Sequence, residues 1–146
     1  ESIVLTLDLR RSLRFDEGTD EYTLKPVLVA VDATKAATVS GAVDLDCPTG
    51  NTALRNGAVY VFSGRNVVPD DVDGSGIEPV ASARIESPLG TATRRYEVNY
   101  LAPGDYTLAP TCRADEDESG ASDALEFGPT VNVRLEAGDS EQVDLD

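Results

Sequence analysis

Three aspartates stand close together in one glycine-rich stretch of the chain. Asp70, Asp71 and Asp73 fall within five residues that end at Gly74. Carboxylate oxygens are the hard ligands that Ca²⁺ prefers. The sequence therefore offers Asp70, Asp71 and Asp73 as a candidate calcium site. The spacing fits an EF-hand-type loop only in part, because Ser82 stands where that loop needs a bidentate glutamate, so a solvated acidic loop is the alternative.

A second acidic stretch follows further along the chain. Residues 115–118 are all acidic, and Asp123 lies close behind, so these side chains could add ligands if they fold beside the first group. The whole chain has 27 acidic residues against 12 basic ones and a net charge of −15. Such a surface repels nucleic acid and anionic lipid. It is typical of a protein that binds cations or stays soluble in a salty medium.

The residue types present exclude several kinds of catalysis. The chain has no histidine, which excludes nucleophilic catalysis by a Ser-His-Asp or Cys-His arrangement. A glycosidase-like pair among Asp70, Asp71 and Asp73 stays open as a low-turnover hydrolase, although no apolar pocket that would raise one carboxyl pKa is evident. The two cysteines, Cys47 and Cys112, lie at the ends of expected strands and suggest a disulfide, with two free thiols as the alternative. A disulfide indicates an oxidising compartment.

Residues 96–112 give the clearest prediction of the secondary structure that positions these side chains. Tyrosine, valine and leucine alternate with polar residues on both sides of Pro103 and Gly104, and this pattern predicts a β-hairpin. Pro103 presets the first turn position, and Gly104 is expected to supply a positive φ at the next. The four tyrosines Tyr60, Tyr96, Tyr100 and Tyr106 are expected to pack in the core, with stacking on a sugar as the alternative.

The rest of the chain reads as short strands separated by turns. Residues 2–9 alternate as a half-buried strand does, and Pro26 marks an edge or a bulge in the next run. A long polar loop is expected over 63–79, and residues 130–136 and 141–145 are expected to close the fold as a pair. We predict an all-β fold: an antiparallel β-sandwich of about seven strands over residues 37–146, with an extra N-terminal β-hairpin over residues 1–36.

Two stretches resemble known families. Residues 38–146 resemble the transthyretin-like, carboxypeptidase-regulatory-like β-sandwich, chiefly through Leu101-Ala102-Pro103-Gly104-Asp105-Tyr106, with Val39-Ser40-Gly41-Ala42-Val43 and Ala58-Val59-Tyr60-Val61 before it. That resemblance implies a prealbumin-like accessory module without catalytic residues. The first thirty residues resemble the tail of a bacterial lipoprotein domain of unknown function, number four-three-eight-two, through Leu7-Asp8-Leu9-Arg10-Arg11-Ser12 and Tyr22-Thr23-Leu24-Lys25-Pro26. This implies a lipid-anchored parent protein, of which residues 1–36 are the tail of a truncated preceding domain.

These observations favour a non-catalytic, extracytoplasmic module of a surface-anchored lipoprotein, in the periplasm or at the cell surface. Its expected role is structural or in protein interaction, including the pairing of an edge strand with a partner. A carbohydrate-binding module and a low-turnover hydrolase are the alternatives. No cofactor other than the candidate Ca²⁺ is expected, no nucleic-acid partner, and no direct insertion into a membrane, since no apolar run is long enough.

Overall fold

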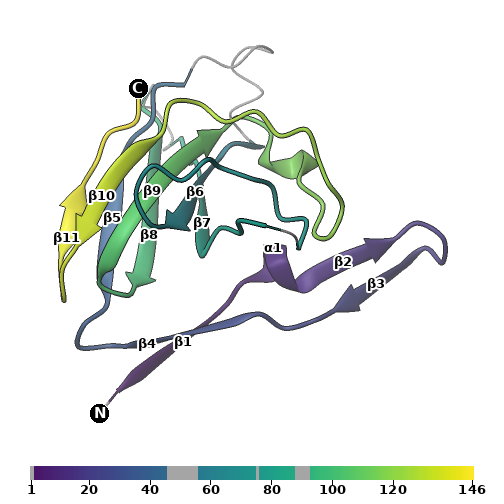
Figure 1. Cartoon of the computed structure of the whole chain (residues 1–146), viewed down its shortest axis with the longest axis horizontal. Helices are drawn as coiled ribbons and strands as arrows, with labels where there is room; N and C mark the ends of the chain where they lie inside the picture. Colours follow the sequence, from purple (N-terminus) through teal and green to yellow (C-terminus); the bar gives the residue numbers. More distant parts are fainter. Residues whose placement is uncertain (1, 46–55, 75, 88–92) are drawn as a thin grey trace.

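The chain folds into two β-sheets that pack face to face, with a separate two-stranded extension below them (Figure 1). The computed structural model describes residues 2–45, 56–74, 76–87 and 93–146. One sheet has the order β10 (Val131–Leu135), β9 (Gly104–Thr111), β6 (Ala58–Ser63) and β7 (Ala81–Arg84). The other has the order β11 (Ser140–Gln142), β5 (Ala37–Ala42) and β8 (Arg95–Leu101).

The main core lies between these two sheets. Val39 of β5 and Val98 of β8 meet Val59 and Val61 of β6 and Leu108 of β9, and all five are at most 4% exposed. β5 and β8 alternate in burial, so one face of their sheet turns inward. β6 and β9 are buried on both faces, because Val72, Ala114 and Phe127 pack on their outer side. Burying a side chain of this size contributes about 1.5–3 kcal/mol. The expectation of an all-β sandwich is confirmed, with seven strands in the two sheets over the described ranges.

The predicted hairpin over 96–112 is wrong in its pairing. β8 pairs with β5, whereas β9 pairs with β6 and β10, so the turn carries the chain from one sheet to the other. Apolar alternation is the same for a hairpin and for a crossing between sheets, because both turn one face of each strand to the core. Gly104 does not have a positive φ; the left-handed residue here is Tyr100, with φ 62°. The Tyr106 hydroxyl donates a hydrogen bond of 2.6 Å to the Ala102 carbonyl and closes the turn.

The predicted closing pair is also wrong. β10 and β11 lie in different sheets, and β11 runs parallel to β5. Gly138, with φ 81°, lets the chain turn between them. Beyond β11 the chain continues along β5, where the Val143 and Leu145 amides donate to the carbonyls of Ser40 and Ala42.

The expected N-terminal hairpin is present as a long two-stranded extension, which we call the ribbon (residues 3–32). β1 (Ile3–Leu7) pairs with β4 (Leu28–Asp32), and β2 (Leu13–Asp16) pairs with β3 (Glu21–Leu24). Between the two halves lie the short helix α1 (Leu9–Ser12) on one side and Pro26 on the other, where a missing amide interrupts the ladder. In Figure 1 the ribbon runs along the lower side of the sandwich, and β2 and β3 extend beyond it.

Two further expectations concern the cysteines and the membrane. Cys47 lies outside the described residues, so its pairing with Cys112 stays a prediction. Cys112 is buried directly after β9. Over the described ranges, the structure contains no helix with the length and apolarity needed to cross a bilayer.

Candidate functional site

The three aspartates that the sequence grouped as a calcium site differ in their burial. Asp70 is exposed, Asp73 is half-buried and Asp71 is 3% exposed. Asp71 instead lies with Asp117 and Asp123, and the three offer carboxylate oxygens within 4.8 Å of one another. The two acidic stretches therefore do converge, but with a different set of side chains. We call Asp71, Asp117 and Asp123 the carboxylate clasp.

Each member of the carboxylate clasp accepts at least one hydrogen bond from the protein. Asp117 accepts from the Val72 amide at 3.0 Å and from the Tyr60 hydroxyl. Asp71 accepts from the amide of Asp123, which itself accepts from the Glu118 amide at 2.7 Å. Over the described residues, no buried polar side-chain atom lacks a partner. The clasp thus ties the 63–79 loop to the segment after β9, and calcium binding at Asp70, Asp71 and Asp73 stays a prediction.

Burial and negative charge shift the pKa of two groups around the clasp. The pKa of the Tyr60 phenol is raised, first by desolvation and then by its hydrogen bond to Asp117. The pKa of Asp70 is raised, first by desolvation and then by the side chain of Asp71. The Tyr60 phenol therefore stays protonated and keeps donating to Asp117 throughout the neutral range.

Arginines of α1 attach the ribbon to these acidic loops. The Arg10 guanidinium lies 4.0 Å from the Asp117 carboxylate, stacks 5.5 Å from the centre of the Tyr60 ring, and donates to the Ala114 carbonyl. Arg11 lies 4.0 Å from Glu78. Both arginines thus pair with loops far along the sequence.

The ribbon turns a broad set of large apolar side chains toward solvent. Of the twelve exposed large hydrophobic residues among those described, nine belong to the ribbon, and we call these nine the apolar face: Ile3, Leu5, Leu7, Leu9, Leu13, Phe15, Tyr22, Leu24 and Leu28. Their exposed fractions run from 36% for Phe15 to 68% for Tyr22. The sequence predicted that the strand over residues 2–9 buries its leucine side. In the structure that side is exposed, so this prediction was wrong.

Strand register gathers these residues on one side of each half of the ribbon. Leu13 stands opposite Leu24, and Phe15 stands opposite Tyr22 with ring centres 4.8 Å apart. In the other half, Leu7 stands opposite Leu28. Directly opposed residues of an antiparallel pair share a face, so each half carries an apolar surface.

The other side of the ribbon faces the sandwich. Val31 of β4 is 7% exposed, and Val4 and Val29 are half-buried. In the β2–β3 half, the Arg14 guanidinium lies where a side chain on Gly120 would stand. The ribbon therefore contacts its own molecule with valines and arginines. Of its exposed leucines, Leu7 and Leu9 also border the groove beside the sandwich.

A groove of about 430 Å³ remains between the ribbon and the sandwich. Its walls come from β1 and β4 on one side and from β7 and β8 on the other, and Tyr100 is 50% exposed on its rim. Tyr60, Tyr96 and Tyr106 are at most 7% exposed, which agrees with their expected packing in the core. Tyr100 is the exception among the four.

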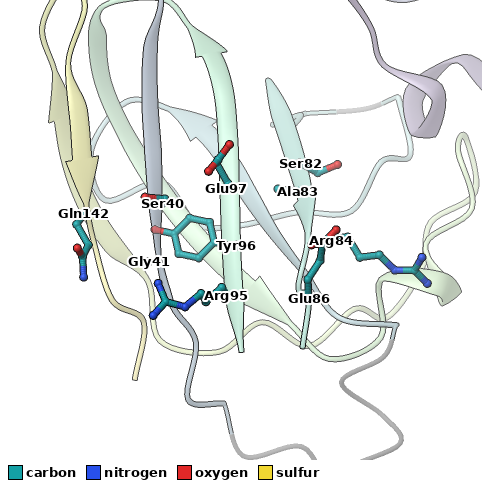
Figure 2. A pocket seen from close by; sticks show the side chains of 10 residues that line it. All are labelled: Ser40, Gly41, Ser82, Ala83, Arg84, Glu86, Arg95, Tyr96, Glu97 and Gln142. Atoms are coloured by element: carbon teal, nitrogen blue, oxygen red, sulfur yellow. The ribbon is translucent and has the colours of Figure 1, made fainter. Parts of the chain in front are cut away.

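A second groove, of about 600 Å³, lies along the seam between β7 and β8 (Figure 2). Arg84 and Glu86 come from the β7 side, and Arg95 and Glu97 from β8, so its charges are balanced. The Tyr96 ring stands near the centre of the view but is 3% exposed, because its hydroxyl reaches across to the Val143 carbonyl at 2.7 Å. The groove therefore offers no aromatic platform to a sugar and no single sign of charge to an ion.

Comparisons with protein-family models, with curated proteins and with solved structures found no match for this chain. The resemblances noted from sequence accordingly stay hypotheses. The exposed surface that sequence reasoning missed is the apolar face. The alternation in residues 2–9 showed that the strand has an apolar side, but it did not show that the rest of the chain leaves this side exposed.

Proposed function

We propose that this chain is a non-catalytic interaction module of an extracytoplasmic, surface-anchored protein, and that it binds a protein partner through the ribbon. The observation that carries this proposal is the apolar face. Contiguous apolar patches larger than a few hundred Å² are rare on soluble monomers and mark sites of interaction. Here the patch lies on an extension that stands apart from the main core.

The ribbon needs a partner for a second reason, which is its strand number. Each half has only two strands, and a two-stranded sheet in water is marginally stable without a layer on its apolar side. β1 and β4 also pair only with each other among the described strands, so each has one open edge. A protein surface supplies both the apolar layer and the backbone partners.

The chemistry of the apolar face favours a protein over other partners. Leu5 and Leu24 offer no hydrogen bonds to a sugar, and Tyr22 and Tyr100 are the exposed tyrosines of the described residues. The net charge of −15 opposes nucleic acid and anionic lipid. The hydrolase alternative has less support, since Asp71 is buried and accepts the Asp123 amide.

The extracytoplasmic location is part of the same proposal. It rests on the predicted disulfide between Cys47 and Cys112 and on the resemblance of the first thirty residues to a lipoprotein domain. A comparison of intact mass after alkylation with and without reductant tests the disulfide. Identical masses would contradict both the disulfide and the inferred compartment.

Replacing two residues of the apolar face tests the interaction role. We expect Leu5→Ser with Tyr22→Ser to change the free energy of unfolding by less than about 1 kcal/mol, because both side chains are exposed. The same variant should elute earlier from a hydrophobic-interaction column. The control Leu108→Ser alters a core residue with no exposure and should lower stability strongly.

Two results would contradict the proposal. One is a loss of stability in the double variant as large as that of the core control, which would make the apolar face part of the protein's own packing. The other is unchanged retention when the protein is loaded at a concentration too low for self-association, which would mean that the face is covered within the chain.

A further inference from the structure

We propose that the occupant of the apolar face is a second copy of this chain, which packs its own ribbon against the first. This inference rests on the proposed function and specifies its partner. The two ribbons would lie face to face as two sheet layers about 10 Å apart, related by a two-fold axis. Each copy would then supply the layer that the other lacks.

The area of the apolar face is sufficient for a stable dimer. Its nine residues are exposed by 36–68%. Leu7 and Leu9 also border the groove beside the sandwich, so we count only the other seven. With about 200 Å² for each fully exposed large side chain, these seven present on the order of 800 Å² per copy, which matches the roughly 800 Å² per partner of a standard interface. No other part of the described chain offers such a set, since the remaining exposed large hydrophobic residues are Val68, Ile77 and Tyr100.

The distribution of charge also favours this surface for contact between copies. β1 has no charged residue, and in β4 only Asp32 is charged. Residues 3–32 hold six acidic and four basic side chains, whereas the whole chain holds 27 and 12. Two copies therefore repel each other least where their ribbons meet, and most where their sandwiches meet.

This arrangement predicts an unusual response to salt. Salt screens the repulsion between two chains of charge −15, and sulfate strengthens the burial of apolar surface. Association should therefore become tighter as salt rises. An interface held by ion pairs would show the opposite trend.

Sedimentation equilibrium of the whole chain in a series of sodium sulfate concentrations tests the inference. We expect a reversible monomer–dimer equilibrium whose dissociation constant falls at least tenfold from low to high salt. Leu5→Asp should weaken the dimer at least a hundredfold, because it buries a charge within the interface. Val68→Asp adds the same charge at a residue that is 76% exposed outside the ribbon, and it should match the unaltered chain.

A chain that stays monomeric at all salt and protein concentrations would overturn the second copy as the partner. So would a dimer that Leu5→Asp leaves intact, or one that weakens with salt. The proposed function fails on different evidence, namely unchanged column retention of the Leu5→Ser and Tyr22→Ser variant. A monomer with a retained, accessible apolar face would thus indicate a different protein partner.

Discussion

At the scale of single residues, the buried carboxylates Asp71 and Asp117 act as acceptors for the protein's own donors. Asp117 accepts hydrogen bonds from the Val72 amide and the Tyr60 hydroxyl, and it lies beside Arg10. A buried carboxylate is tolerated only with such partners. Asp117 belongs to an acidic stretch that suggested a cation site in the sequence. In the structure its carboxylate joins two loops and holds the ribbon.

The hydroxyl of Tyr60 tests this account of Asp117. We expect Tyr60→Phe to lower the free energy of unfolding by about 1–3 kcal/mol, because the buried carboxylate loses a donor while the ring stays in place. Tyr22→Phe removes a hydroxyl that is exposed and should change stability by less than about 0.5 kcal/mol. Urea unfolding of both variants gives the comparison. Equal effects in the two would contradict the role assigned to Tyr60.

Three buried tyrosines predict how stability changes at alkaline pH. Desolvation is the main cause that raises the pKa of Tyr60, Tyr96 and Tyr106 in the folded protein. A raised pKa means that the folded state holds the proton more tightly, so this stability is complete below the unfolded value of about 10 and is lost as pH rises above it.

Absorbance of phenolate and circular dichroism, followed together from pH 8 to 13, measure this effect. We expect the main absorbance change to coincide with the loss of β structure. Ionisation of all five tyrosines before any loss of structure would show that the three are not buried.

At the scale of elements, local signals predicted the strands well and their partners poorly. The alternation in β8 and β9 correctly marked two strands, and the strand edge at Pro26 was also foreseen. Pairing was not, because β8 and β9 turn the same kind of apolar face to one core from opposite sheets. The same ambiguity placed β10 and β11 together, although they belong to different sheets.

Gly104 and Gly138 each lie in a turn, and they show where the sequence interpretation and the structure differ. Gly104 has no positive φ, and a Cβ added there would meet only ordinary contacts at 3.6–3.7 Å with Tyr106. Gly138 has φ 81° and open space around it. We expect Gly104→Ala to change stability by less than about 0.5 kcal/mol, and Gly138→Ala to cost about 1 kcal/mol from backbone strain alone. Thermal unfolding of both variants measures these two effects. A larger loss of stability in Gly104→Ala than in Gly138→Ala would contradict the observed turn geometry.

The candidate site was predictable only in part. The sequence showed that two acidic stretches could meet, and Asp71 and Asp123 do meet. It could not show that Asp70 and Asp73 stay outside, because that depends on how the 63–79 loop folds back onto the segment after β9. The exposure of Leu5 and its neighbours was hidden for a similar reason: alternation reveals that a strand has an apolar face, but not whether its own chain covers that face.

At the scale of the whole molecule, the sandwich and the ribbon differ in what they bury. The sandwich closes its apolar residues between two sheets, while the ribbon is fixed to it by Arg10 and Arg11 and leaves its apolar face outward. In a chain this acidic, a large uncharged surface has a cost in solubility. The proposed association through that surface, with a second copy as the partner, would account for its presence.

The three isoleucines of the chain provide the most direct test of this claim. Ile3 is 65% exposed on the apolar face, Ile77 is 47% exposed on the 63–79 loop, and Ile85 is 3% exposed in the core. Methyl-labelled isoleucine in NMR spectra, recorded over a series of protein concentrations in high salt, reports on all three sites at once. We predict that the Ile3 methyl signal shifts or broadens as concentration rises, while the Ile77 and Ile85 signals stay constant. A concentration-independent Ile3 signal, or a change at Ile77 instead, would contradict association through the ribbon.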